Sequence, residues 1–183
     1  MKSDNGFVLK TPEDGQGYWV DGDLYYLKLH SSEIGGAYAV FELTVAPYGK
    51  GPLPHRHAET SEAFYILEGS LTMSIEGQEL IAPPGTFSFV PPGTTHTYSN
   101  PNPAPAKVFK IISPGGFEDF FVEFGQPATT RSNPLAEVPM PDVEKAQELA
   151  EKYHIDFDLD GFTPPDRSRC QSHTPSRVAH DRH

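Results

Sequence analysis

Two histidines separated by one residue, a glutamate close behind them and a third histidine further along form the most informative pattern in the sequence. They are His55, His57, Glu62 and His96. Successive side chains of a β-strand point to opposite faces, so His55 and His57 on one strand would face the same side. Three neutral imidazoles and one carboxylate suit a first-row transition-metal ion and leave positions open on an octahedral one. The pattern therefore predicts a metal site that performs chemistry or exchanges ligands.

Short apolar segments between glycine and proline turns indicate strands that would position these residues. Glu62 opens an apolar run that is typical of a buried strand, and His96 follows the turn signal Pro91-Pro92-Gly93. Further strands are expected at 17–20, 24–29, 38–45 and 107–112. Many short strands between such turns predict an all-β domain.

A coincidental grouping of surface histidines and a solvated acid is the alternative explanation, because a His-x-His pair alone is common. The framing residues argue against coincidence, since Gly49, Gly69, Gly85, Pro91 and Gly93 place turns around all four candidate ligands. Glycine permits turns with positive φ that other residues resist. We therefore take the glycines as structural and the four polar residues as the site.

Residues at these positions resemble the two sequence motifs of the cupin family. The first motif comprises Gly49, His55, His57, Glu62 and Gly69, and the second comprises Gly85, Pro91, Gly93, His96 and Asn100. The resemblance implies a double-stranded β-helix, or jelly-roll barrel, over about residues 17–113. It also implies that the barrel interior holds one divalent transition-metal ion (Fe, Ni, Mn, Co, Cu or Zn) on the four candidate ligands.

Two helices are expected after the barrel, over about residues 115–155. The first is indicated by Phe117, Phe120, Phe121 and Phe124, which recur at helical spacing. This stripe is more typical of core packing against the barrel than of an aromatic substrate box. The second helix is expected over about 142–153, with Asp142 as its N-cap.

The segment over residues 113–128 and the helix after it resemble single-domain bacterial quercetinase-like cupins. The resemblance implies a metal-dependent dioxygenase that opens the ring of a flavonol-like or other enolic aromatic molecule. Glu62 would then act as metal ligand and as the catalytic base that takes the proton of the enolic hydroxyl.

Strand alternation predicts the substrate pocket. Phe64 and Ile66 share the face of Glu62, and Tyr98 shares the face of His96, so these three side chains should line the cavity. Ordinary core packing is the alternative for each. A buried Tyr98 hydroxyl would need a polar partner, which a substrate could provide.

Two other functions remain open on the sequence. Cupins with the same ligands also catalyse isomerisation, decarboxylation, lyase and cyclisation reactions of small molecules, in which the metal acts as a Lewis acid. A non-catalytic small-molecule-binding cupin is the third alternative, because a fold does not fix a function.

Length and charge fit one acidic domain. The chain has 183 residues and a formal net charge of −11, which disfavours nucleic acid as a partner. No apolar segment approaches the roughly 18 residues of a membrane span, and the N-terminus lacks the apolar core of a signal peptide, which favours a cytoplasmic location. We expect a single domain over 1–165 and a polar, disordered tail over 166–183 that contains an incidental thiol, Cys170. The expected partners are a small-molecule substrate, dioxygen and, by analogy, a second copy in a homodimer.

Overall fold

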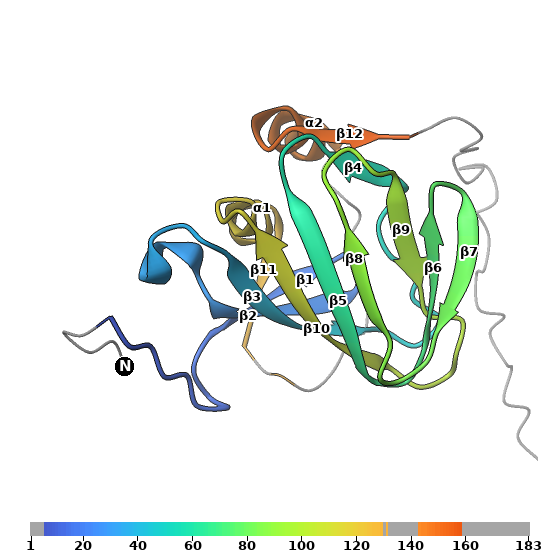
Figure 1. Ribbon diagram of the computed structural model, residues 1–183, viewed down its shortest axis with the longest axis horizontal. Helices are drawn as coiled ribbons and strands as arrows, with labels where there is room; N and C mark the ends of the chain where they lie inside the picture. Colours follow the sequence, from blue (N-terminus) through green and yellow to red (C-terminus); the bar gives the residue numbers. More distant parts are fainter. Residues whose placement is uncertain (1–5, 130, 132–142, 159–183) are drawn as a thin grey trace, which may run out of the picture.

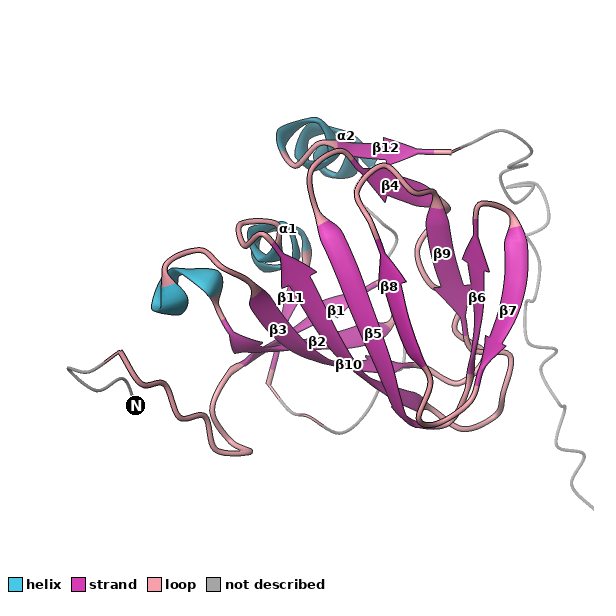
Figure 2. Ribbon diagram, viewed as in Figure 1, coloured by secondary structure: helices cyan, strands magenta, loops and turns pink. Residues whose placement is uncertain are grey.

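The computed structural model describes residues 6–129, 131 and 143–158. In this part of the chain two antiparallel sheets face each other as the halves of a jelly roll, with α-helices near one end (Figures 1 and 2). The expected N-cap Asp142, the tail over 166–183 and Cys170 lie outside the described residues.

The larger sheet holds seven strands within the described ranges, in the spatial order β11, β1, β2, β3, β10, β5, β8. Its strands are β1 (Gln16–Val20), β2 (Asp23–Leu29), β3 (Ala39–Val45), β5 (Ser61–Glu68), β8 (Phe87–Val90), β10 (Ala106–Ser113) and β11 (Gln126–Ala128). Expected strands at 17–20, 24–29, 38–45 and 107–112 correspond to β1, β2, β3 and β10.

The smaller sheet has five strands among the residues that the structure describes, in the order β12, β4, β9, β6, β7. Its strands are β4 (His55–His57), β6 (Leu71–Ile75), β7 (Gln78–Ala82), β9 (His96–Ser99) and β12 (Ile155–Phe157). No backbone pairing in the described part of the chain joins the two sheets into one closed barrel. The predicted all-β jelly roll is thus confirmed, with the barrel formed by two facing sheets.

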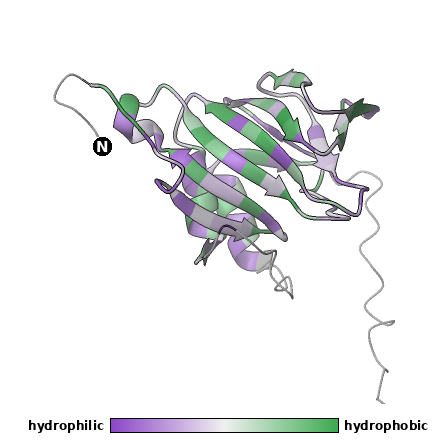
Figure 3. Cartoon of the chain, turned by 90° about the horizontal axis from the view of Figure 1, so that it is seen from below, coloured by the Kyte–Doolittle hydropathy of each residue, from purple (hydrophilic) through white to green (hydrophobic). Residues whose placement is uncertain are grey.

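Alternating burial along the strands explains why the sheets pack face to face. In β10, Ala106, Val108, Lys110 and Ile112 are buried while the residues between them are more exposed. Figure 3 shows the same alternation of hydrophobic and hydrophilic residues on several strands. Burying one face of each sheet removes apolar surface from water, which is the main favourable contribution to folding.

The helices cover one end of the space between the sheets. Among the described residues they are α1 (Glu118–Phe124) and α2 (Val143–Lys152), with a short 3₁₀ helix, η1 (Ser31–Ile34), on the larger sheet's side. Phe117 and Phe121 bury their rings in the core, and Ala150 of α2 buries its methyl group there. No helix in these ranges is long and apolar enough to cross a membrane.

The second helix lies close to its expected range of about 142–153. Helix α2 ends at Lys152, and residues Ile155–Phe157 form strand β12 along the edge of β4. Strands β11 and β12 both lie beyond the expected barrel limit of about residue 113. Such short strands are defined by long-range pairing, which local periodicity does not reveal.

The motif glycines are structural, as expected, and Gly69 shows why. Its φ is +72°, a conformation that L side chains rarely adopt. A Cβ added there would lie 2.9 Å from the Cα of Ala106. Gly69 therefore allows the backbone to turn from β5 into β6 while it lies close to Ala106 at the start of β10.

Candidate metal centre

Strand β4 carries the first two candidate ligands on one face. His57 is 2 % exposed and His55 is largely buried, while Arg56 between them points outward and forms an ion pair of 3.0 Å with Asp156 of β12. The alternation expected of a strand is therefore present, and both imidazoles face the interior.

The other two candidate ligands arrive from different sheets. His96 of β9 is paired in register with His55. Glu62 comes from β5 in the opposite sheet, where it is 2 % exposed. Its Oε2 atom lies 3.2 Å from Nε2 of His96, and its Oε1 atom lies 3.6 Å from Nε2 of His57. The four side chains thus meet between the sheets.

Backbone carbonyls orient two of the rings. The Nδ1 atom of His55 donates to the Leu53 carbonyl at 2.7 Å, and the Nδ1 atom of His96 donates to the Thr94 carbonyl at 3.0 Å. These bonds place the hydrogen on Nδ1 and leave the lone pair of Nε2 free, which is the usual way that a protein orients a metal-binding histidine.

His57 gives the clearest sign of a missing partner. Neither of its ring nitrogens has a hydrogen-bond partner among the described residues, although the side chain is buried. Buried polar atoms are nearly always satisfied, so such a ring needs a ligand. One ligand nitrogen from each of His55, His57 and His96 lies within 4.8 Å of the other two. The donors present therefore fit a bound transition-metal ion, with Glu62 beside them as a fourth candidate.

Burial and neighbouring charges keep His55 and His57 neutral. Burial, with the nearby His96 and His57, lowers the pKa of His55 to about 3. The pKa of His57 falls to about 4, mainly through burial and against the attraction of Glu62. Neutral imidazoles are the form that binds metal.

Glu62 is ionised for the opposite reason. Burial alone would raise its pKa, but the ammonium of Lys110 holds the pKa well below its usual range. The site therefore contains a carboxylate at neutral pH, available as a metal ligand or as a proton acceptor.

Lys110 is the functional residue that the sequence reasoning missed. Its Nζ atom lies 2.9 Å from Oε1 of Glu62, and its side chain is only 4 % exposed. Lysine is almost never buried without a partner. A signal was present in the sequence, because Lys110 has the same strand phase as the apolar Val108 and Ile112 and so faces inward.

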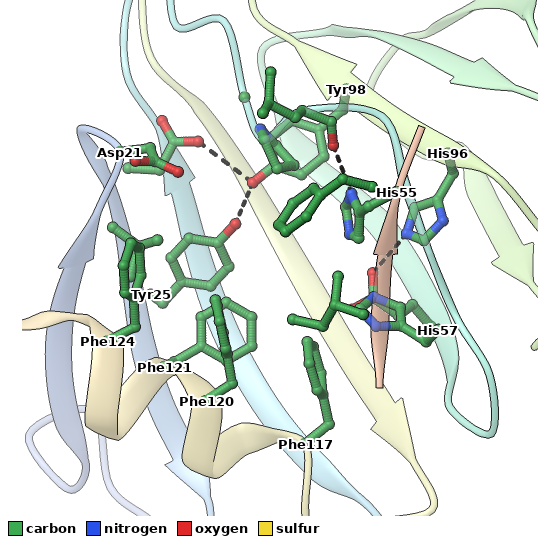
Figure 4. A pocket seen from close by; sticks show the side chains of 18 of the residues that line it. Asp21, Tyr25, His55, His57, His96, Tyr98, Phe117, Phe120, Phe121 and Phe124 are labelled. Atoms are coloured by element: carbon green, nitrogen blue, oxygen red, sulfur yellow. Dashed lines mark hydrogen bonds and ion pairs between the residues drawn. The ribbon is translucent and has the colours of Figure 1, made fainter. Parts of the chain in front are cut away.

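A cavity of about 430 Å³ adjoins this group. Its volume falls in the range of roughly 300–1,000 Å³ that is typical of small-molecule sites. The wall contains all four candidate ligands, Lys110 and residues of both helices and of β12. Figure 4 shows the three histidines on one side of the pocket and the phenylalanines of the α1 region on another.

The α1 phenylalanines line this cavity. They are Phe117, Phe120, Phe121 and Phe124. Phe117 and Phe120 stack with an interplanar angle of 8°, and Phe117 also lies against the ring of His57 at 4.3 Å between centroids. The expected core packing is present for Phe117 and Phe121, and the same stripe also borders the cavity.

A second cluster of hydrogen-bonded side chains, Asp23, Tyr25 and Tyr98, lies away from the histidines. The Tyr98 hydroxyl is hydrogen-bonded to the Tyr25 hydroxyl and donates to Oδ2 of Asp23 at 3.3 Å (Figure 4). Oδ1 of Asp23 accepts from the Ala46 amide at 2.9 Å. Burial raises the pKa of Asp23 to about 7, and the nearby Asp21 adds to the shift.

The three predicted pocket residues have different positions. Tyr98 lines the cavity, as expected from the strand phase that it shares with His96. Phe64 and Ile66 are fully buried in the hydrophobic core and are not among the residues that line the described cavity. The Phe64 ring lies behind the site, with its centroid 5.2 Å from Lys110 Nζ and 6.5 Å from the His96 ring. Strand phase thus predicted burial correctly but did not predict which buried rings meet the cavity.

This geometry defines a jelly-roll domain with an interior cavity and a candidate metal site. Residues 41–112 match the cupin domain family, and they contain all four candidate ligands. This segment of the chain is therefore a cupin domain.

Among characterised proteins the chain is similar to quercetin 2,3-dioxygenases. It is 40 % identical over 125 residues to that of Bacillus subtilis (strain 168), which covers 67 % of this chain and 36 % of the relative. It is 30 % identical over 130 residues to that of Aspergillus japonicus, covering 67 % of this chain and 37 % of the relative. The chain therefore spans little more than a third of the length of either dioxygenase.

A solved structure supports the fold. KdgF from Halomonas sp. superposes with a TM-score of 0.54 over 62 % of this chain and 98 % of that protein, at 18 % identity. At that identity the similarity concerns the fold alone, which agrees with the two facing sheets.

Proposed function

We propose that this protein is a metal-dependent dioxygenase that opens the ring of a flavonol-like or other enolic aromatic molecule. The observation that carries the proposal is the convergence of His55, His57, His96 and Glu62 on one cavity with a phenylalanine-rich wall. Similarity to two quercetin 2,3-dioxygenases supports the same reaction class. A divalent transition metal held by these residues would supply Lewis-acid and redox chemistry at the inner end of the cavity.

In this proposal Glu62 takes the proton of the substrate's enolic hydroxyl. The carboxylate is ionised, and its Oε1 atom has a second lone pair beside the ion pair with Lys110, so it can accept a hydrogen bond from a substrate. Proton abstraction needs a base within hydrogen-bond reach of the donor, and Glu62 lines the cavity. The second carboxylate oxygen, Oε2, faces His96 and the metal-binding nitrogens. One carboxylate can therefore serve as both ligand and base.

The aromatic wall would bind the substrate's rings. Phe117 lies beside His57, and Phe120 and Phe124 continue the ring surface away from the histidines (Figure 4), where stacking and exclusion of water favour a flat aromatic molecule. Water exclusion also strengthens the interaction between the substrate's developing charge and the polar end of the cavity.

Oxygen consumption tests the proposal. Protein purified without chelators, or reloaded separately with Fe, Mn, Co, Ni or Cu, would be given flavonols in an oxygen electrode. We expect uptake with at least one metal, and both atoms of labelled dioxygen in the ring-opened product. No uptake with any of these metals, in protein shown to be fully loaded, would refute the dioxygenase.

Two glutamate variants test whether the reaction depends on Glu62. Glu62→Gln should lower kcat by about 10²–10⁴-fold, because it removes the proton acceptor. Glu59→Gln, an exposed change three residues earlier, is the matched control and should retain activity. Turnover that continues without oxygen, or with redox-inert zinc, would instead assign one of the non-oxidative cupin reactions.

A further inference from the structure

Lys110 is a buried cation in an aromatic surrounding. Its Nζ atom lies 5.5 Å from the ring centre of Tyr25 and 5.2 Å from those of Phe64 and Phe121. Cation–π contacts of this kind stabilise an ammonium but do not neutralise it. Among the described residues, Glu62 is the one carboxylate that forms an ion pair with it.

A metal ion would change this balance of charge. The single negative charge of Glu62 already lies between Lys110 and His57 at Oε1 and His96 at Oε2. Burying a charge without compensation is costly, and a divalent ion would add two positive charges without adding a negative one. The other described carboxylates that line the cavity are Asp21, which is exposed, and Asp23, which is buried and has a raised pKa because of that burial. The metal-loaded cavity therefore lacks negative charge at the end where Lys110 lies.

We propose that Lys110 binds an anionic oxygen of the ligand, either a carboxylate or the enolate that forms when Glu62 takes the substrate's proton, so that the cavity favours flat aromatic anions over neutral molecules of the same shape. Lys110 lines the cavity, so its ammonium is available to a bound molecule. Phe117 and Phe120 provide the stacking surface for the aromatic part. The proposal rests on the proposed function, since it names the charge state of the substrate class at that site.

Binding of a matched ligand pair tests this selection without catalysis. The probes are 2-naphthoate and 2-naphthamide, which share a ring system and differ in charge. Affinities for zinc-loaded protein would be measured by titration calorimetry, with zinc content determined for every variant. We expect Lys110→Met to weaken the binding of 2-naphthoate by about ten- to a hundredfold, the usual effect of losing a hydrogen bond to a charged group. The affinity for 2-naphthamide should stay nearly unchanged.

Other lysine variants separate charge from structure. Lys110→Arg keeps the charge and should retain much of the preference for 2-naphthoate. Lys107→Met on the same strand removes an exposed lysine, paired with Glu68 at 3.0 Å, and should change neither affinity. Lys110→Gln replaces Lys110→Met in the comparison if the methionine variant fails to fold or loses zinc.

Several results would overturn the proposal. Wild-type protein that binds 2-naphthamide as tightly as 2-naphthoate overturns it without any variant. If Lys110→Met lowered the affinity for both ligands equally, Lys110 would only shape the pocket or hold Glu62 in place. Failure of the proposed dioxygenase reaction can be distinguished from failure of the proposed anion site. A protein that takes up no oxygen but still prefers 2-naphthoate would refute the reaction and leave the anion site supported.

Discussion

Replacing Asp23 by asparagine should make the free energy of unfolding less dependent on pH. Asp23 is 2 % exposed and ionises at pH about 7 in the folded protein, against 3.8 for an unperturbed aspartate. Between these values the folded protein keeps a proton that the unfolded chain has released. Stability therefore falls as pH rises from about 4 to about 7, and the loss is complete above that range.

The size of the effect follows from the pKa difference. A shift of about three units corresponds to about 4 kcal/mol, of which about 2.5 kcal/mol falls between pH 5 and pH 8. The introduced asparagine would imitate the protonated aspartate, because its side chain can still accept from the Ala46 amide and donate to Tyr98. The variant should be similar to wild type in stability near pH 4 and more stable at pH 8.

Urea unfolding of metal-free protein at pH 5, 6, 7 and 8 measures this difference directly. Other titrating groups, including His55 and His57, contribute equally to both proteins and cancel. Asp156→Asn, at an exposed carboxylate paired with Arg56, is the control and should follow wild type in its pH dependence. Parallel curves for Asp23→Asn and wild type across this range would show that Asp23 is ionised in the folded protein throughout.

Three further changes test the packing and the metal site. Phe121→Ala removes a ring that lies 4.4 Å from Tyr25 between centroids and should cost about 3–5 kcal/mol in urea unfolding, whereas Val122→Ala, more exposed on the same helix, should cost less than about 1 kcal/mol. His57→Ala should reduce metal affinity more than about tenfold by titration with a chromogenic chelator, whereas His154→Ala should not. Lys152→Met breaks an exposed ion pair and should change stability by less than about 1 kcal/mol, so a larger loss would contradict the packing described for α2.

Local periodicity was sufficient to predict the ligand face. His55 and His57 alternate with an exposed Arg56, so the period of two in a strand gave their common direction directly. It could not show that Glu62 lies in the opposite sheet, because the choice of sheet depends on pairing between β5, β10 and β8. The chemistry of the group was thus readable from the sequence, whereas its position between two layers was not.

The partners of individual side chains were harder to predict. The inward phase of Lys110 was visible in β10, but its pairing with Glu62 depends on the neighbouring strand register, which sets Lys110 opposite Phe64. The cluster of Asp23, Tyr25 and Tyr98 joins residues more than 70 positions apart in the chain. Contacts of this kind arise from packing between sheets and leave no periodic signal in the sequence.

Strand β12 shows why the ligands and the cavity belong to different parts of the chain. The matched family region, 41–112, holds all four candidate ligands, but much of the cavity wall lies outside it. Phe157 of β12 lies opposite His55 in the strand register, and its ring centroid is 6.3 Å from that of the histidine. The four phenylalanines of the α1 region also follow the family region in the chain. The cupin match therefore covers the candidate metal ligands, and in the proposed function the segments that follow it would determine much of which aromatic molecule fits beside them.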